Sequence, residues 1–230
     1  MTDYIVATIK PWNIAAFHRR TPALPGRWHL ITEPAALDTD ALAACAPRYL
    51  FFPHWSWRVP ADILERFECV SFHMTDLPYG RGGSPLQNLI ARGHENTQVS
   101  ALRMVEALDA GPIYLKRPAS LAGRAQDIFE RVADLIYDMI AEIVEKEPKP
   151  VSQSGPVTTF ARRAPEQGRL PGRGPLRAIY DHIRMLDAET YPSAFLDYGE
   201  YRLEFSHAEL DDGEVGARVV IRQRKKRNES

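Results

Sequence analysis

Two short stretches of the chain combine residue types that could carry acid–base chemistry. Ser71–Gly83 reads S-F-H-M-T-D-L-P-Y-G-R-G-G, and Val105–Pro112 reads V-E-A-L-D-A-G-P. The first stretch overlaps a mostly apolar run, Phe67–Phe72, that predicts a strand, so His73 is expected at the carboxyl end of that strand. In an open α/β sheet, ligands bind outside the carboxyl ends of the strands. His73 is therefore a candidate for general acid–base catalysis.

Asp109 is the candidate partner of this histidine. The run Val99–Val105 predicts a neighbouring strand, and Asp109 lies in the turn that follows it. A carboxylate near an imidazole stabilises its protonated form and orients the ring. The loop Leu77–Gly83 has one proline and three glycines, which favour a tightly shaped loop that another molecule can approach closely. Ser84 and Pro85 then predict the N-cap and the first residue of a helix. A hydrogen-bonded structural role for the histidine is the alternative, which the glycine-rich loop disfavours.

The segment Pro53–Leu121 resembles the catalytic core of the folate-dependent formyltransferases, and within them it is closest in kind to the sugar-nucleotide N-formyltransferases. Several linked motifs carry the resemblance, in the family's order: Ser71-Phe72-His73, Leu77-Pro78-Tyr79-Gly80-Arg81-Gly82, Pro85-Leu86-Gln87, Thr97-Gln98-Val99 and Leu108-Asp109-Ala110-Gly111. One position departs from the family pattern, because Ser71 stands where the family has asparagine. A serine hydroxyl can still donate one hydrogen bond, but it is shorter and rotates freely.

The resemblance implies a site as well as a reaction. It implies that a neutral amine attacks the formyl group of N10-formyltetrahydrofolate. We expect no metal, because His54 has no partner at metal-ligand spacing. The implied catalytic residues are His73, Asp109 and Ser71. Folate contacts are implied for Trp57, Arg58, Val59, Ala107 and Asp109. For the acceptor side we expect contacts from Tyr79, Arg81, Gly82 and Gln87. The tetrahedral oxyanion would be met by His73 together with Ser71 or a nearby amide donor, Gln87 or Asn88.

We expect the acceptor to be a small-molecule amine. Among such amines, we favour a nucleotide-linked amino sugar. The stretch 176–230 holds nine Lys or Arg and eleven Asp or Glu residues, which argues against a basic surface for tRNA. Arg81, Arg162 and Arg163 are candidates for meeting a diphosphate. Two other functions stay open: hydrolysis of formyltetrahydrofolate, with water replacing the amine, and a non-catalytic folate-binding homologue that lost turnover through Ser71.

Composition limits the class of protein. The net charge of −1 gives no global electrostatic argument for nucleic acid or membrane as a partner. Only the end of the chain, Arg222–Arg227, is strongly basic, and we expect it to be a solvated terminus. Cys45 and Cys69 form no disulfide framework, and His54 has no partner at metal-ligand spacing. Without a signal-like segment or an apolar run of membrane-spanning length, we expect a soluble, cytoplasmic protein.

The order of predicted elements indicates an α/β fold: a Rossmann-like open sheet, mostly parallel, followed by a small C-terminal α+β module. We expect a catalytic domain over 1–147, an extended proline-rich connection over 148–175 and the small module over 176–230. Exposed strands of that module could pair between chains, so a homodimer is possible. The predicted strands of the first domain are Tyr4–Ile9, Trp28–Thr32, Arg48–Phe52, Phe67–Phe72, Val99–Val105 and Pro112–Arg117, and its longest amphipathic helix is Asp127–Glu145.

Overall fold

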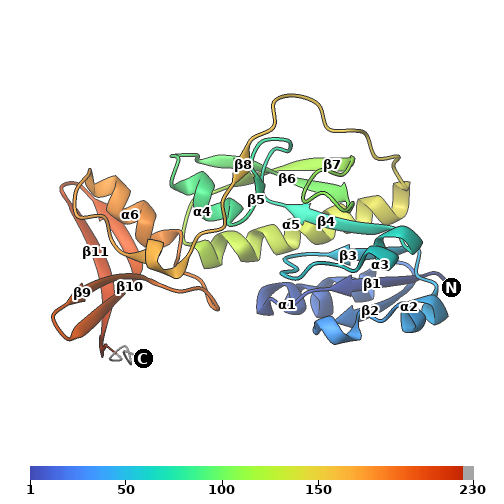
Figure 1. Ribbon diagram of the computed structural model, residues 1–230, viewed down its shortest axis with the longest axis horizontal. Coiled ribbons are helices and arrows are strands. Elements are labelled where there is room, and N and C mark those ends of the chain that lie inside the picture. Colours follow the sequence, from blue (N-terminus) through green and yellow to red (C-terminus); the bar gives the residue numbers. More distant parts are fainter. Residues whose placement is uncertain (225–230) are drawn as a thin grey trace.

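The centre of the protein is a six-stranded sheet with the order β2-β1-β3-β4-β6-β7 (Figure 1). The computed structural model describes residues 1–224. The parallel strands are β1 (Asp3–Ala7), β2 (Arg27–Ile31), β3 (Tyr49–Phe52) and β4 (Cys69–His73). The antiparallel strands are β6 (Asn96–Arg103) and β7 (Ile113–Ser120). The expected open, mostly parallel sheet is confirmed.

The direction of β6 determines how Asp109 reaches His73. Because β6 is antiparallel to β4, its carboxyl end at Arg103 lies beside Val70, near the start of β4. Asp109 therefore does not reach His73 by ending a parallel strand; the loop after β6 brings the chain back towards it. Gly111 allows this return, because a Cβ there would lie 1.7 Å from the Arg103 carbonyl oxygen.

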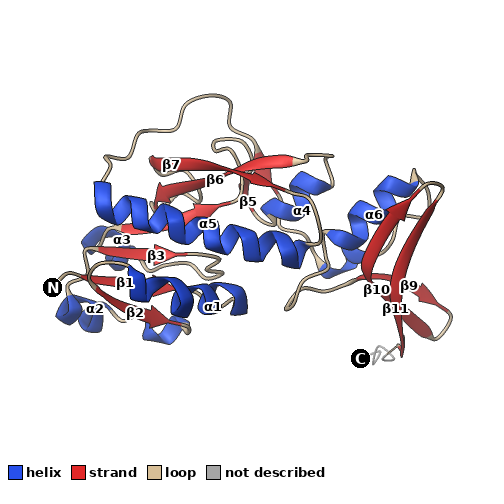
Figure 2. Ribbon diagram, turned by 180° about the vertical axis from the view of Figure 1, so that it is seen from behind, coloured by secondary structure: helices blue, strands red, loops and turns tan. Residues whose placement is uncertain are grey.

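Helices cover both faces of the sheet, as expected for an α/β fold. Alternate residues of β1 face opposite sides, so Tyr4 packs in one apolar cluster and Ile5 in the other. On one face lie α1 (Pro11–Arg20) and α5 (Ala125–Lys146), and Figure 2 shows α5 running along this face of the sheet. On the other face lie α2 (Thr39–Cys45) and α3 (Ala61–Arg66). The predicted stripe of α5 is buried core, and each large side chain buried there contributes roughly 1.5–3 kcal/mol.

The glycine-rich loop is held by the long connection that follows α5. In the loop, β5 (Arg81–Gly82) pairs with β8 (Thr159–Phe160) of the connection, which arches over the sheet in Figure 1. Ser84 is the N-cap residue of α4 (Pro85–Ile90) and Pro85 is its first residue, as predicted, but Ser84 has a left-handed backbone with φ 49° and its side chain makes no capping hydrogen bond. Its hydroxyl instead accepts a hydrogen bond from the Arg163 backbone N–H. Three short 3₁₀ helices complete the first 175 residues: η1 (Thr21–Ala23), η2 (Pro34–Ala36) and η3 (Pro165–Gly168).

The C-terminal module is a helix on an antiparallel sheet, as expected. Its elements are α6 (Leu176–Arg184), β9 (Ala194–Tyr198), β10 (Tyr201–Asp211) and β11 (Glu214–Gln223). The sheet and α6 stand at one end of the molecule (Figure 1). The predicted basic end of the chain lies partly outside the described residues, from 225 onward. Within the described part, no helix combines the length and apolar character needed to cross a membrane.

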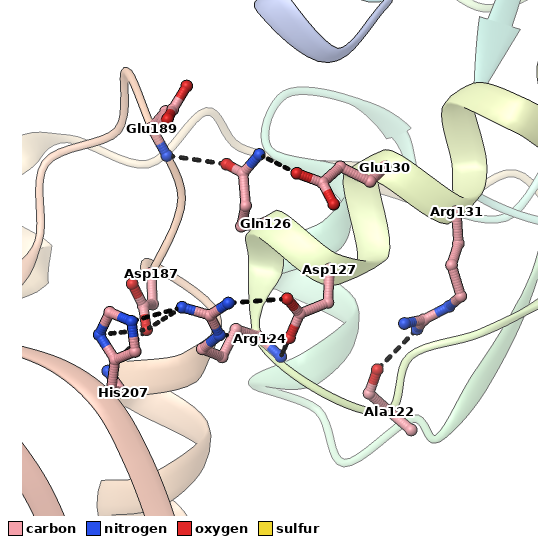
Figure 3. Close-up of polar contacts among 9 residues, drawn as sticks. All are labelled: Ala122, Arg124, Gln126, Asp127, Glu130, Arg131, Asp187, Glu189 and His207. Carbon is pink, nitrogen blue, oxygen red and sulfur yellow. Dashed lines mark hydrogen bonds and ion pairs between the residues drawn. The ribbon is translucent and has the colours of Figure 1, made fainter. Parts of the chain in front are cut away.

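Polar contacts join this module to the first turn of α5 (Figure 3). Arg124 donates a hydrogen bond to Asp127 at 2.8 Å and lies 3.8 Å from a carboxylate oxygen of Asp187. The Glu189 backbone N–H donates to the Gln126 side-chain oxygen at 3.0 Å. These contacts attach the C-terminal module to α5, whose buried face forms part of the main hydrophobic core.

Candidate active site

His73 is the last residue of β4 and is almost completely buried. Its Nε2 lies 2.8 Å from the Gly80 carbonyl oxygen. A carbonyl can only accept, so Nε2 carries the hydrogen in this contact. In the neutral imidazole, Nδ1 is then the nitrogen with a lone pair, available to take a proton.

The structure brings Asp109 to this nitrogen. Asp109 Oδ2 lies 3.6 Å from His73 Nδ1 and also accepts a hydrogen bond from the Gly82 backbone N–H at 2.8 Å. The Asp109 backbone has a left-handed φ of 52°, and its carbonyl accepts a hydrogen bond from Gln153 at 2.8 Å. A non-glycine residue in that region is strained by about 1–3 kcal/mol, and such strain persists where surrounding contacts enforce it. Here the glycine loop and the long connection together fix the carboxylate.

Both residues line a cavity of about 1280 Å³ that extends across the carboxyl ends of β1, β3 and β4. Part of the cavity wall is apolar and suited to binding a flat ring. This part of the wall is formed by Phe52, Trp55, Trp57, Val59, Leu102 and Met104. Every residue expected to contact folate lines this cavity: Trp57, Arg58, Val59, Ala107 and Asp109. Ser71 also lines it, on the same side of β4 as His73.

The residues expected on the acceptor side divide into two pairs. Gly82 and Gln87 line the cavity, although the Gln87 amide already donates to the Met185 carbonyl at 3.2 Å. Tyr79 and Arg81 are not among the residues that line the cavity, and their contact with the acceptor stays a prediction. The Tyr79 hydroxyl contacts His94 at 3.0 Å, and Arg81 donates twice to the Gln153 side-chain oxygen, so both side chains stabilise the loop.

Asn88, the other amide expected near the oxyanion, also serves the loop. Its side-chain nitrogen lies 3.0 Å from three backbone carbonyls, those of Gly83, Ser84 and Ala161. It therefore has no N–H left for a substrate.

Two residues of the cavity wall were not assigned a site role by sequence reasoning. His54 Nδ1 lies 2.8 Å from the Asn13 amide nitrogen and 3.4 Å from the Trp12 indole nitrogen. Burial, with a smaller contribution from the positive charge of Lys10, lowers the pKa of His54 to about 4, so its ring is neutral at physiological pH. Lys10 follows β1 and also lines the cavity. A lone lysine or histidine after a strand carries no sequence signal, so neither could be identified from spacing.

One set of possible metal ligands occurs in the described part of the chain: Asp3, His29 and Cys45, with ligand atoms within 4.8 Å of one another. The set lies at the start of β1, at the end of the sheet away from His73. Arg27 donates to both carboxylate oxygens of Asp3 and holds the pKa of that carboxyl well below its usual range. A guanidinium already supplies positive charge to this carboxylate, so the set is poorly suited to a cation.

Comparison with known proteins identifies the family. A family model described as methionyl-tRNA formyltransferase, C-terminal domain, matches residues 165–222. The methionyl-tRNA formyltransferase of Gluconobacter oxydans (strain 621H) is 30% identical over 198 residues, covering 84% of this chain and 62% of that protein. The solved structure of methionyl-tRNA formyltransferase from Clostridium thermocellum is 45% identical, covers 97% of this chain and 100% of that chain, and has a TM-score of 0.94. The chain belongs to the folate-dependent formyltransferase family.

The formyltransferase family uses N10-formyltetrahydrofolate, and the apolar wall beside His73 fits the flat ring of that donor. HypX from Aquifex aeolicus, solved in complex with tetrahydrofolic acid, shares the fold at 14% identity and a TM-score of 0.73, covering 89% of this chain and 37% of that chain. The chain spans about three-fifths of the length of the curated relatives it matches. The 45%-identical structure carries the name methionyl-tRNA formyltransferase, so the expected closeness to sugar-nucleotide members was not what these comparisons found.

Proposed function

We propose that this protein transfers the formyl group of N10-formyltetrahydrofolate to a primary amine. The observation that carries the proposal is the His73–Asp109 pair, with 3.6 Å between Nδ1 and Oδ2, in the wall of a cavity with an apolar face for a pterin. An imidazole beside a carboxylate is the arrangement used for proton transfer. Amide formation requires the amine to lose a proton, and we propose that the His73–Asp109 pair accepts it.

The proposed mechanism needs no covalent enzyme intermediate. The neutral amine attacks the formyl carbon, and the carbonyl oxygen becomes an oxyanion. His73 Nδ1 then accepts the ammonium proton, and Asp109 stabilises the imidazolium that forms. The carbonyl re-forms as the bond between the formyl carbon and N10 breaks, and the imidazolium returns its proton to N10, so that tetrahydrofolate leaves and His73 is neutral again. Because neutral His73 directs its N–H at Gly80, the hydroxyl of Ser71 is the proposed oxyanion donor. Holding both substrates together supplies much of the rate enhancement.

Methionyl-tRNA is the first acceptor to test, because it is the one named for the 45%-identical relative. A nucleotide-linked amino sugar is the second candidate. The observation that favours it is the charge of 176–230, with nine Lys or Arg against eleven Asp or Glu, since a surface for tRNA is expected to be basic.

The test is an acceptor panel with the full chain and N10-formyltetrahydrofolate. Methionyl-tRNA, nucleotide-linked amino sugars and a sample without amine are incubated in parallel, and mass spectrometry detects formylated product and formate. Formylated acceptor supports the proposal and identifies the acceptor. Formate released equally with and without amines would instead mean hydrolysis, and folate binding without any product would mean a non-catalytic homologue.

A further inference from the structure

Gln153, in the long connection after α5, forms hydrogen bonds with both polar atoms of its side-chain amide. Its Nε2 lies 2.8 Å from the carbonyl oxygen of Asp109 and 2.8 Å from that of Gly111. Its Oε1 lies 3.1 Å from Nε and 2.7 Å from Nη2 of Arg81. An amide nitrogen has two hydrogens to donate and an amide oxygen accepts two hydrogen bonds, so the whole hydrogen-bonding capacity of this side chain is used.

The partners determine both the orientation and the chemistry of the Gln153 amide. A guanidinium can only donate and a backbone carbonyl can only accept, so Oε1 faces Arg81 and Nε2 faces the two carbonyls. A carboxylate in this place would have no hydrogen for the carbonyls, and a cationic side chain would repel Arg81. Gln153 therefore serves two kinds of partner that a charged side chain could not serve together.

Backbone pairing brings Gln153 to the turn that carries Asp109. Val151 and Ile113 form an antiparallel bridge, in which each backbone N–H donates to the other residue's carbonyl at 2.8 Å. Two residues further along each of these antiparallel segments, Gln153 lies opposite Gly111. The contact of the Gln153 side chain with the turn therefore follows from the path of the backbone.

The hydrogen bonds form a closed circuit around Asp109. Its carbonyl oxygen accepts from Gln153, whose Oε1 accepts from the Arg81 side chain. The residue after Arg81, Gly82, donates its backbone N–H to Asp109 Oδ2 at 2.8 Å. Asp109 is thus held at its backbone carbonyl and at its carboxylate, and both attachments lead to two consecutive residues of the glycine-rich loop.

Asp109 needs such support because its backbone is left-handed, with φ 52°. This conformation is strained for a residue other than glycine and persists only where surrounding contacts enforce it. Without the Gln153 contact the turn can relax, which would move Asp109 Oδ2 away from His73 Nδ1, now 3.6 Å distant. Gln153 does not line the cavity, so it can act on the reaction only through the residues that it holds.

We propose that Gln153 is a positioning residue for formyl transfer, which keeps the Asp109 carboxylate beside His73 and against the glycine-rich loop. The inference rests on the proposed function, because the rate it affects is that of proton transfer by the pair. It extends the functional unit beyond the cavity to the connection. Docking of the connection, through Gln153 and through the pairing of β8 with β5, is then a condition for a complete pair.

The experiment compares two variants of Gln153 with a matched control, all in the full chain. Gln153→Glu keeps an acceptor for Arg81 and removes both N–H donors, and Gln153→Ala removes the whole amide. Gln167→Glu is the control, since Gln167 is exposed on the same connection and does not line the cavity. The Gln167 side-chain oxygen accepts from the Ala164 backbone N–H, which a glutamate can also do.

Hydrogen exchange of the Gly82 amide, followed by NMR, reports on the circuit without any substrate. Because Gly82 donates to Asp109 Oδ2, its amide should exchange about tenfold faster in both Gln153 variants and at the wild-type rate in Gln167→Glu. The amides of β3 should exchange as in wild type in all three variants, which separates this local effect from loss of folding. Unchanged Gly82 exchange in both Gln153 variants would overturn the inference.

Initial rates with the acceptor found in the panel test the effect on the reaction. We expect kcat to fall by about 10- to 100-fold in Gln153→Glu and to stay unchanged in Gln167→Glu, because a small displacement of a reacting group has a large effect on rate. In an Asp109→Asn background, the same Gln153→Glu change should lower kcat by less than about threefold, because the carboxylate that it positions is already absent. An equal loss in both backgrounds would mean that Gln153 acts on folding or on another group, which is the contrary result.

Failure of the inference and failure of the proposed function give different results. Formylation of an amine by Gln153→Glu at the wild-type rate would contradict the positioning role alone. Faster Gly82 exchange in the Gln153 variants of a chain that formylates no amine would contradict the proposed function and leave the circuit around Asp109 standing.

Discussion

Asp109 approaches His73 without forming a hydrogen bond to it: Oδ2 is 3.6 Å from Nδ1, while the same oxygen accepts from the Gly82 backbone at 2.8 Å. The carboxylate thus couples the imidazole to the glycine-rich loop. A contact of this length can shorten when the imidazole becomes protonated. The proposed catalytic pair and the loop should therefore respond together to mutation.

Removing either member of the pair should reduce turnover far more than folding stability. His73→Ala and Asp109→Asn are each expected to lower kcat by about 10²- to 10⁴-fold, because proton transfer from the ammonium loses its acceptor or its electrostatic support. Initial rates with the acceptor found in the panel provide the measurement. Asp76→Asn is the matched control, since Asp76 lies near the same loop but pairs with Lys116 and should leave kcat unchanged. Equal rates in wild type and both pair variants would contradict this assignment.

Gly111→Ala should disturb the position of Asp109. A Cβ at this residue would lie 1.7 Å from the Arg103 carbonyl oxygen, so the backbone must shift. Overpacking of this kind costs about 1–3 kcal/mol, and we expect both a lower Tm and a lower kcat. Gly172→Ala is the control, because nothing lies within 4 Å of its added Cβ. Thermal unfolding measures the Tm of both variants. An equal Tm for Gly111→Ala and Gly172→Ala would contradict this prediction, because it would mean that the loop accommodates the added Cβ without strain.

His54 should make stability depend on pH. Burial lowers its pKa to about 4, below the value near 6.5 expected in the unfolded chain. Between these values the unfolded chain binds a proton that the folded chain excludes, so the free energy of unfolding should fall as pH drops from about 6.5 to about 4. His54→Gln should flatten this part of the curve, measured by denaturant unfolding at several pH values. His18→Gln, at an exposed position of α1, should keep the wild-type slope; a His54→Gln slope equal to wild type would contradict the assignment.

Arg184 should be a major attachment of the C-terminal module. It is 3% exposed and donates to the carbonyls of Leu121 and Gly123 as well as to Asp181. Arg184→Met leaves these buried acceptors unpaired and should cost about 3–5 kcal/mol of stability. Arg177→Met removes an exposed partner of the same Asp181 and should cost about 0.2–1 kcal/mol. Denaturant unfolding compares the two, and equal costs would be the contrary result.

Local patterns in the sequence were sufficient to predict most elements and to select the candidate pair His73 and Asp109. Strand composition and the helical spacing of α5 predicted the layers, and linked motifs identified His73 and Asp109 before their contact was seen. The direction of β6 was not predictable, because an apolar run reads the same in parallel and antiparallel pairing.

Side-chain partners that are distant in sequence could not be predicted. Tyr79 and Arg81 are residue types that often contact ligands. In the structure, however, the Tyr79 hydroxyl contacts His94 and the Arg81 guanidinium donates to Gln153. Lys10 joins the cavity wall because β1 and β3 are neighbours in the sheet, and Arg162 joins it because the long connection pairs with the glycine-rich loop through β8 and β5. No spacing along the chain encodes either relationship.

The most direct test of formyl transfer follows the formyl carbon itself. The full chain is supplied with ¹³C-formyl-labelled N10-formyltetrahydrofolate and the amine acceptor, and NMR records where the label goes in wild type and in His73→Ala. We expect the label to appear on the acceptor nitrogen in wild type, with an equal amount of tetrahydrofolate, and to stay on the folate in the variant. Label that remains on folate in both proteins, or that appears as formate at the same rate with and without amine, would contradict the account.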